Sequence, residues 1–255
     1  MRAIIITGAS SGIGKALAIE YANKGIVLGL LGRDRARLEA VAMACREQGA
    51  VCEYASIDVR DNEALAAWLI AFDNKFPIEL VIVNAGITGA PESGEVLERR
   101  EVAQSLIDVN LAAVVKTTEA VVPLLSGRQS GQIAFVSSLA ALRGMALTPV
   151  YSATKAGVKA YAEAMYDLLT PMGIDVSLIC PGFVESPMSE QFPGPRPFMI
   201  SAGKAAVLIR RGLEKRRYYI AFPWSFSMGL RILSVVPIWV GSLFLRGLAL
   251  HKKIL

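Results

Sequence analysis

The chain has 255 residues, of which 53% are apolar and 19% are charged, and its formal net charge is +5. This composition excludes an intrinsically disordered protein, and the length excludes a small domain held together by disulfides.

Short apolar runs alternate with longer amphipathic stretches along residues 1–223. Nearly continuous Ile, Val and Leu in a short run is typical of a strand buried on both faces, and strand–helix alternation predicts right-handed βαβ units. We expect one α/β domain over 1–223, a Rossmann-type, doubly wound parallel sheet of about seven strands with helices on both faces. The predicted strands are 3–6, 26–31, 51–57, 80–83, 132–136, 175–179 and 218–222, and the predicted helices include 15–24, 35–48, 62–75, 102–125 and 152–169.

A glycine-rich turn, Thr-Gly-Ala-Ser-Ser-Gly-Ile-Gly over residues 7–14, joins the first predicted strand to the first helix. Glycines allow a tight turn and a close approach of the backbone to a pyrophosphate. The helix N-terminus then offers free N–H groups and a partial positive charge to that anion. The position between strand and helix predicts a dinucleotide site. Its expected residues are Gly8, Ser10, Ser11, Gly12, Ile13 and Gly14.

The end of the second predicted strand bears on the choice between NADP and NAD. An NAD enzyme places a carboxylate just after this strand to accept a hydrogen bond from the ribose 2′-OH. Gly32 holds that position here, and Arg33 follows it. A guanidinium pairs with the 2′-phosphate of NADP, which a carboxylate would repel. We therefore expect NADP rather than NAD, and we expect Asp34 to cap the following helix.

Tyr151 and Lys155 open the predicted helix before the sixth strand and lie four residues apart, on one helical face. A free phenol has a pKa near 10, which makes it a poor acid or base at neutral pH. A neighbouring ammonium stabilises the phenolate and lowers that pKa. The pair therefore predicts acid–base chemistry by Tyr151.

The Gly-x-x-x-Gly-x-Gly spacing of the turn resembles that of the short-chain dehydrogenase/reductase family, in its short single-domain branch, and the resemblance continues to about residue 222. It implies an NADP-dependent oxidoreductase that interconverts a carbonyl and a secondary alcohol. NADPH would deliver hydride to the carbonyl carbon, and Tyr151 would donate the proton to the oxygen. Ser138 would orient that oxygen, and Asn110 would hold a water in the proton relay. Lys155 would also hold the nicotinamide ribose.

The same resemblance implies the other cofactor contacts. Asp58 and Val59 would meet the adenine, and Asn84, Ala85 and Gly86 would support the cofactor at the end of the fourth strand. Pro181, Gly182, Val184 and Ser186 would close around the nicotinamide, with Ser186 standing where the family usually has Thr. Ser137, the neighbour of Ser138, is expected to face the opposite way because side chains alternate along a strand.

Residues 187–203 are expected to select the substrate, with the alternative that they only cover the sheet. Apolar side chains there favour a small lipophilic carbonyl or alcohol substrate. These side chains are Met188, Phe192, Phe198, Met199 and Ile200.

An apolar and basic extension, 224–255, follows the domain and contains no acidic residue. From residue 201 onward the chain holds ten Lys/Arg and one acidic residue. Residues 1–200 hold 17 Lys/Arg and 21 acidic residues. The longest uncharged run of the extension, 232–245, is too short to cross a bilayer, which needs about 20 residues. It predicts one or two helices in a membrane interface, anchored by Trp224 and Trp239, or else a dimer contact or substrate lid. In composition the extension resembles that of membrane-associated members that reduce lipids.

The remaining expectations concern partners, compartment and competing functions. The single histidine, His251, and three unpaired cysteines, Cys45, Cys52 and Cys180, predict neither a metal site nor disulfides. With a strand directly at the N-terminus, they predict a cytoplasmic protein, or one peripheral to the inner face of a membrane. Scattered basic clusters without a groove-reading motif favour no nucleic-acid partner.

By family analogy, 102–125 and 152–169 would form a homodimer or homotetramer contact. An NADP(H)-binding redox sensor with little turnover remains the alternative function.

Overall fold

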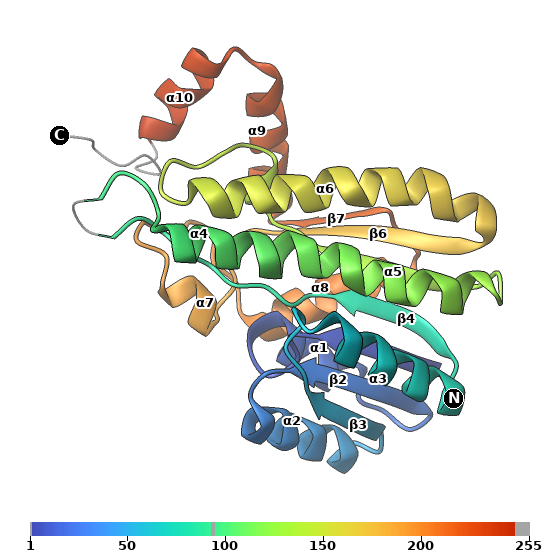
Figure 1. Cartoon of the computed structure of the whole chain (residues 1–255). Helices are drawn as coiled ribbons and strands as arrows, with labels where there is room; N and C mark the ends of the chain where they lie inside the picture. Colours follow the sequence, from blue (N-terminus) through green and yellow to red (C-terminus); the bar gives the residue numbers. More distant parts are fainter. Residues whose placement is uncertain (1, 93–94, 248–255) are drawn as a thin grey trace.

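The computed structural model describes residues 2–92 and 95–247 and places a seven-stranded parallel sheet at the centre of the chain (Figure 1). The strand order is β3-β2-β1-β4-β5-β6-β7. The expected doubly wound fold is therefore confirmed. The strands are β1 (Arg2–Thr7), β2 (Ile26–Gly32), β3 (Val51–Ser56), β4 (Ile78–Val83), β5 (Gly131–Val136), β6 (Ile174–Pro181) and β7 (Tyr219–Phe222).

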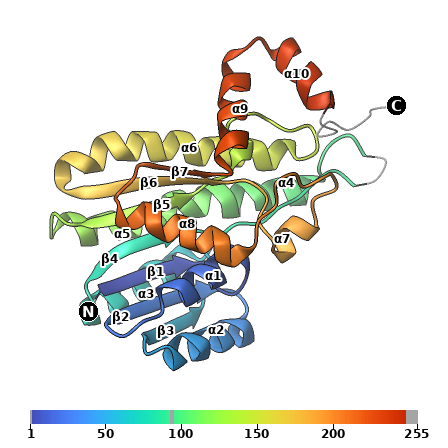
Figure 2. The ribbon, with the colours of Figure 1, turned by 180° about the vertical axis from the view of Figure 1, so that it is seen from behind.

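Helices cover both faces of the sheet because its strands are apolar on both sides. Along β1, Ile4 and Ile6 belong to one buried core, and Ile5 belongs to the other. One core lies beneath α1 (Gly12–Tyr21), α2 (Arg35–Glu47) and α8 (Ala202–Glu214), as Figure 2 shows. The other lies beneath α3 (Asn62–Lys75), α5 (Ala113–Ser126) and α6 (Pro149–Leu169), on the side facing the reader in Figure 1.

The strand order changes direction between β1 and β4, because the chain leaves β3 at one edge and crosses to the far side of β1. In open α/β sheets, ligands bind beyond the carboxyl ends of the strands at such a switch point. The glycine turn after β1 and the segment after β4 therefore meet at the place where a nucleotide site is expected.

The predicted helix 102–125 is present as one helical stretch, Arg100–Ser126, but it is not regular throughout, because a π-helical turn lies within it. The structure has α4 (Arg100–Ile107), a π-helical turn (Asp108–Ala112) and then α5. A π-turn accommodates one extra residue and occurs frequently at functional sites. Asn110 lies in this turn and pairs with the backbone of Ile87, donating from Nδ2 to its oxygen (3.0 Å) and accepting from its N–H at Oδ1 (2.8 Å).

The helical stretch Arg100–Ser126 is long and apolar enough to span a membrane by length and composition. Val114, Val121 and Leu125 are buried in the core beside β4 and β5. Its apolarity therefore matches that of a core helix.

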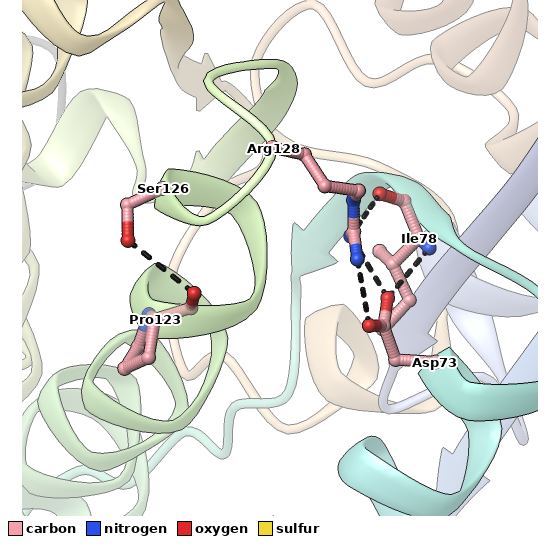
Figure 3. Close-up of polar contacts among 5 residues, drawn as sticks. All are labelled: Asp73, Ile78, Pro123, Ser126 and Arg128. Atoms are coloured by element: carbon pink, nitrogen blue, oxygen red, sulfur yellow. Dashed lines mark hydrogen bonds and ion pairs between the residues drawn. The ribbon is translucent and has the colours of Figure 1, made fainter.

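A partly buried ion pair ties α3, β4 and the segment after α5 together at the end of the sheet where β4 begins (Figure 3). The Asp73 side chain is 9% exposed and accepts two hydrogen bonds from the Arg128 guanidinium, at 2.7 and 2.9 Å. Arg128 also donates to the Ile78 carbonyl (3.0 Å), and the Ile78 N–H donates to Asp73 (2.8 Å). Nearby, the Ser126 hydroxyl donates to the Pro123 carbonyl (3.3 Å).

The extension forms two helices, α9 (Trp224–Val235) and α10 (Ile238–Gly247), which stand out from the sheet and its covering helices in Figures 1 and 2. The helices are separate because Pro237 lacks the N–H that would continue the first one. His251 and the rest of 248–255 lie outside the described residues. Cys45, Cys52 and Cys180 are buried and free.

Candidate active site

A cavity of about 320 Å³ lies beyond the carboxyl ends of the central strands. Most of the residues predicted from the sequence line it together, although they come from seven separate segments of the chain. These are Gly8, Ser10, Ser11, Gly12, Ile13, Arg33, Asp58, Val59, Asn84, Ala85, Gly86, Ser138, Tyr151, Lys155, Pro181, Gly182, Val184 and Ser186. Gly14 and Asn110 do not line the cavity, but each contacts a residue that does, Gly8 and Ile87 respectively.

The glycine turn after β1 has the shape of an anion cradle. Gly8 has a φ of +68°, a conformation that a side chain disfavours, and a Cβ on Gly14 would lie 2.2 Å from the Gly8 oxygen. Gly14 is therefore needed so that α1 can pack against the turn. Ser11, the N-cap of α1, makes no capping hydrogen bond with its side chain, so this helix end is open to a ligand. Both properties fit a pyrophosphate at the N-terminus of α1.

Thr7, which was not predicted as a site residue, joins the ends of β1 and β4. Its hydroxyl accepts hydrogen bonds from the N–H groups of Asn84 and Ala85, both at 3.0 Å. The Asn84 amide donates in return to the Thr7 carbonyl (2.9 Å) and to the Gly8 carbonyl (3.3 Å). The two loops that form the floor of the cavity are thus held at a fixed separation.

The end of the cavity beyond β2 carries an arginine without a carboxylate partner. Arg33 is exposed, and its guanidinium makes no hydrogen bond or ion pair within the described part of the chain. Asp34 caps α2, as expected, by accepting from the Arg37 N–H (2.9 Å), and it also pairs with the Arg37 side chain (2.6 Å). Arg37 was not predicted as a site residue.

Asp58 is likewise paired, in this case with Arg60 at 2.7 Å. The Arg60 side-chain hydrogen bond holds the pKa of the Asp58 carboxyl below its usual range, and the nearby charge of Arg33 contributes to the same shift. Both carboxylates at this end of the cavity are therefore ionised and already matched by arginines, whereas Arg33 remains available for an anion.

The acid–base pair lies on the first turns of α6. This helix begins at Pro149, three residues earlier than predicted, so Tyr151 sits in its first turn. The Lys155 side chain is buried, donates from Nζ to the Val136 carbonyl (3.0 Å), and lies 5.9 Å from the centre of the Tyr151 ring. Ser138 follows β5, and its hydroxyl accepts from the Ala140 N–H (3.1 Å).

The titration of this pair differs from the expectation that Lys155 lowers the phenol pKa. Burial raises the pKa of Tyr151, and a hydrogen bond with Ser138 opposes that shift. Burial also lowers the pKa of Lys155 to about 8. The physical reason is that burial removes the phenol from water and so disfavours the charged phenolate, while the Lys155 ammonium is held by the Val136 carbonyl. Tyr151 is therefore protonated at neutral pH, which is the state that a proton donor needs.

Asn110 supports the site from below. It is fully buried, and its amide donates to Thr154 Oγ1 (3.3 Å), whose hydroxyl donates to the Tyr151 carbonyl (2.8 Å). A Cβ on Gly86 would lie 3.2 Å from Asn110 Oδ1 and 3.4 Å from Lys155 Nζ. Asn110 thus connects the Ile87 backbone to the first turn of α6, and the expected water in a proton relay remains a prediction.

Two serines near the cavity have defined partners. Ser137 donates to the Lys155 carbonyl (2.8 Å), so its hydroxyl is occupied within the protein while Ser138 is next to Tyr151. The Ser186 hydroxyl caps the short helix α7 (Pro187–Glu190), accepting from the Ser189 N–H and donating to the Val184 carbonyl, both at 3.2 Å. If Ser186 contacts a cofactor, its hydroxyl would therefore make that contact in addition to capping α7.

The end of the cavity beyond Tyr151 is predominantly apolar. Of the predicted substrate-selecting side chains, Met188 and Phe192 line it, whereas Phe198 and Met199 are exposed and Ile200 pairs with Val184. The other lining residues at this end were not predicted from the sequence. They include Leu139, Arg143, Met145, Thr148, Phe183, Phe226 and Leu230. The Thr148 hydroxyl is buried here and has no hydrogen-bond partner among the described residues.

An open helix N-terminus at the switch point, beside a phenol, a hydroxyl and a buried ammonium, defines the site of an oxidoreductase that uses a nicotinamide dinucleotide. The short chain dehydrogenase pattern matches residues 2–195. The chain belongs to the short-chain dehydrogenase/reductase family.

Relatives with similar sequences are oxidoreductases. An uncharacterized oxidoreductase of Myxococcus xanthus is 31% identical over 92% of this chain and 93% of its own. A putative ketoacyl reductase of monensin polyketide synthase from Streptomyces virginiae is 35% identical over 74% of this chain and 73% of its own. A 3beta-hydroxysteroid dehydrogenase of Mediterraneibacter gnavus is 33% identical over 74% of this chain and 68% of its own.

Solved structures of similar fold carry either nicotinamide dinucleotide. A short-chain dehydrogenase from Sphingobium yanoikuyae in complex with NADPH matches with a TM-score of 0.79 and 26% identity, over 93% of this chain and 97% of its own. A family member from Burkholderia phymatum in complex with NAD shares the fold, with a TM-score of 0.81, 23% identity and coverage of 90% and 92%. These structures leave both forms of the cofactor open for this chain.

Proposed function

We propose that this protein is an NADP-dependent reductase that interconverts a lipophilic ketone and its secondary alcohol. The observation that carries the proposal is the position of Tyr151 and Ser138 at the boundary between the dinucleotide cradle and the apolar end of the cavity. Relatives described as a ketoacyl reductase and a hydroxysteroid dehydrogenase support a ketone or alcohol attached to a large apolar body.

The residues of the site divide the work of ketone reduction. When bound, the dinucleotide supplies the hydride. Ser138 donates a hydrogen bond to the carbonyl oxygen and holds it beside the phenol, and Tyr151 transfers its proton to that oxygen as negative charge develops. The positive charge of Lys155, fixed by the Val136 carbonyl, stabilises the phenolate that remains. Alcohol oxidation runs through the same groups in reverse, with the Tyr151 phenolate as base.

The proposed function is tested with a panel of ketones and both reduced cofactors, by following absorbance at 340 nm. We expect oxidation of NADPH with bulky or long-chain ketones, and a lower kcat/KM with short, polar ones, since Phe183, Phe192 and Leu230 offer apolar contact at the substrate end. Equal kcat/KM across the panel would contradict the lipophilic substrate. Cofactor binding without turnover of any ketone or alcohol would favour a redox sensor instead.

Replacing Arg33 by Ala is expected to weaken NADPH binding by about 10- to 100-fold, because a charge-assisted hydrogen bond contributes about 1.5–3 kcal/mol. The affinity for NADH should stay unchanged, since NADH lacks the 2′-phosphate. Fluorescence titration of the two reduced cofactors measures both constants. The prediction depends on Arg33 being unpaired while Asp34 and Asp58 are each matched by another arginine.

Arg35→Ala is the matched control for Arg33→Ala. Arg35 is a neighbouring exposed arginine that does not line the cavity. This variant should bind both cofactors like the wild type. An equal loss of NADPH and NADH affinity in the Arg33 variant would contradict a role in recognising the 2′-phosphate.

We also propose, by family analogy, that the protein forms a homodimer or homotetramer through α5 and α6. The two helices lie side by side over the same core (Figure 1). Multi-angle light scattering of the full chain gives the mass that tests this proposal.

A further inference from the structure

Helix α9 is apolar on two opposite faces. Phe226, Leu230 and Leu233 recur at spacings of four and three residues and pack against the core. On the other side, four apolar residues recur at spacings of four, four and three and are exposed: Trp224 (72%), Met228 (39%), Ile232 (58%) and Val235 (82%). A helix that is apolar on all sides is usually buried on all sides. We therefore expect another molecule to cover the exposed apolar stripe of α9.

The inward face of α9 is part of the active-site wall. Phe226 and Leu230 both line the cavity that contains Tyr151. The next helix, α10, is joined to the same rim, because Arg143 lines the cavity and its guanidinium donates to the Ile238 carbonyl (2.9 Å). Whatever covers the outward side of these helices therefore lies one helix thickness away from the substrate.

The exposed apolar stripe continues beyond α9. Ile238 and Trp239 of α10 are 70% and 73% exposed. Phe198, from the segment expected to select substrate, is also exposed and contacts the Phe226 ring with centroids 5.8 Å apart. We call the outward residues of the two helices the outer apolar face. Its members are Trp224, Met228, Ile232, Val235, Ile238 and Trp239.

The charged residues in the sequence of the extension are all of one sign. Residues 224–255 contain four Lys/Arg and no acid. Among the described ones, Arg231 is exposed beside Ile232 and has its guanidinium 4.0 Å from the centre of the Tyr219 ring. A symmetric contact between two copies of this face would bring like charges together. An anionic bilayer surface instead matches both the apolar stripe and the cations, and Trp224 and Trp239 suit the headgroup boundary.

We propose that the outer apolar face of α9 and α10 docks on the surface of an anionic phospholipid bilayer and brings the mouth of the cavity to the lipid. The two helices have 12 and 10 residues, short of the roughly 20 needed to span, so they lie within the interface. The docking stands on the exposed helices alone, whereas uptake of substrate from the lipid rests on the proposed function.

Vesicle flotation of the full-length protein tests the docking. We expect the wild type to float with vesicles of phosphatidylglycerol and phosphatidylcholine, and to bind vesicles of phosphatidylcholine alone more weakly. The triple variant Met228→Ser, Ile232→Ser, Val235→Ser should lose at least tenfold in partition coefficient. The matched control changes three other exposed apolar residues, Met43→Ser, Ile70→Ser and Leu168→Ser, and should float like the wild type.

Two further measurements separate the possible outcomes. Light scattering gives the oligomeric state, and turnover of a water-soluble ketone without vesicles should be equal in the wild type and the triple variant. Equal flotation of the two proteins, or dissociation of an oligomer by the triple substitution without loss of flotation, would overturn the bilayer proposal. If vesicle binding behaves as expected but no ketone is turned over, the docking stands and the proposed function fails.

Discussion

Tyr151→Phe lowers kcat for ketone reduction by about 10²–10⁴-fold, the range associated with loss of a positioned acid–base group. The substitution removes only the phenol oxygen, so the affinity for the dinucleotide and the stability of the fold should stay close to those of the wild type. Steady-state kinetics with a lipophilic ketone and NADPH measures the loss. A single-turnover experiment places that loss in the chemical step.

The pH dependence of alcohol oxidation provides a second readout for Tyr151. Oxidation needs the phenolate, and burial raises the phenol pKa, so the wild-type oxidation rate should rise from neutral to alkaline pH. Tyr151→Phe should abolish this rise. Tyr161→Phe is the matched control, because Tyr161 lies on the same helix and packs edge-on against Phe135, away from the cavity. Retention of more than a tenth of kcat by Tyr151→Phe would contradict its role as proton donor.

Arg128→Met is expected to lower the free energy of unfolding by about 3 kcal/mol, because loss of one partner leaves a buried charge uncompensated. The Asp73 carboxylate would keep only the Ile78 N–H of its hydrogen bonds, at a place where it is 9% exposed. The estimate is at the low end of the range for buried pairs because Arg128 is itself 35% exposed. Urea unfolding, followed by circular dichroism, measures the change.

Lys116→Met is the control for the ion pair between Asp73 and Arg128. Lys116 and Glu119 form an exposed pair on α5 at 3.2 Å, and such pairs contribute about 0–1 kcal/mol. The double variant Asp73→Leu, Arg128→Met should recover much of the lost stability, since it removes the unpaired charge together with its partner. If Arg128→Met and Lys116→Met cost the same, the network in Figure 3 is no more important than a surface pair.

The sheet could be predicted from the sequence because its strands are buried on both faces and therefore read as uninterrupted apolar runs. Ile4, Ile5 and Ile6 show this directly, since neighbours in the chain enter opposite cores. The glycine turn could be predicted because Gly8 and Gly14 leave no room for a Cβ. Where the backbone conformation allows only one residue type, that conformation can be predicted from a single sequence.

Features that depend on contacts distant in the chain could not be predicted. Nothing around Thr7 indicates that its hydroxyl accepts from Asn84, 77 residues later. A position of the extension beside the substrate was only one of the possibilities that the sequence left open, because a helix that is apolar on two faces does not reveal which face meets the core. The phenol pKa of Tyr151 was misjudged for a related reason. Its spacing from Lys155 is local, whereas the burial that raises its pKa is produced by segments distant in the chain.

The π-turn at Asp108–Ala112 keeps two helices in phase. Leu106 of α4 and Val114 of α5 are both buried, eight residues apart. In a regular α-helix eight residues end roughly 80° past two full turns, whereas seven end within about 20° of them. Because the π-turn contains one extra residue, the eight residues rotate about as far as seven residues of a regular α-helix. Both helices therefore keep the same side against the body of the protein. Deletion of one residue from this turn would therefore leave α4 and α5 in phase as one regular helix, but it would remove the wide turn that places Asn110 opposite the Ile87 backbone.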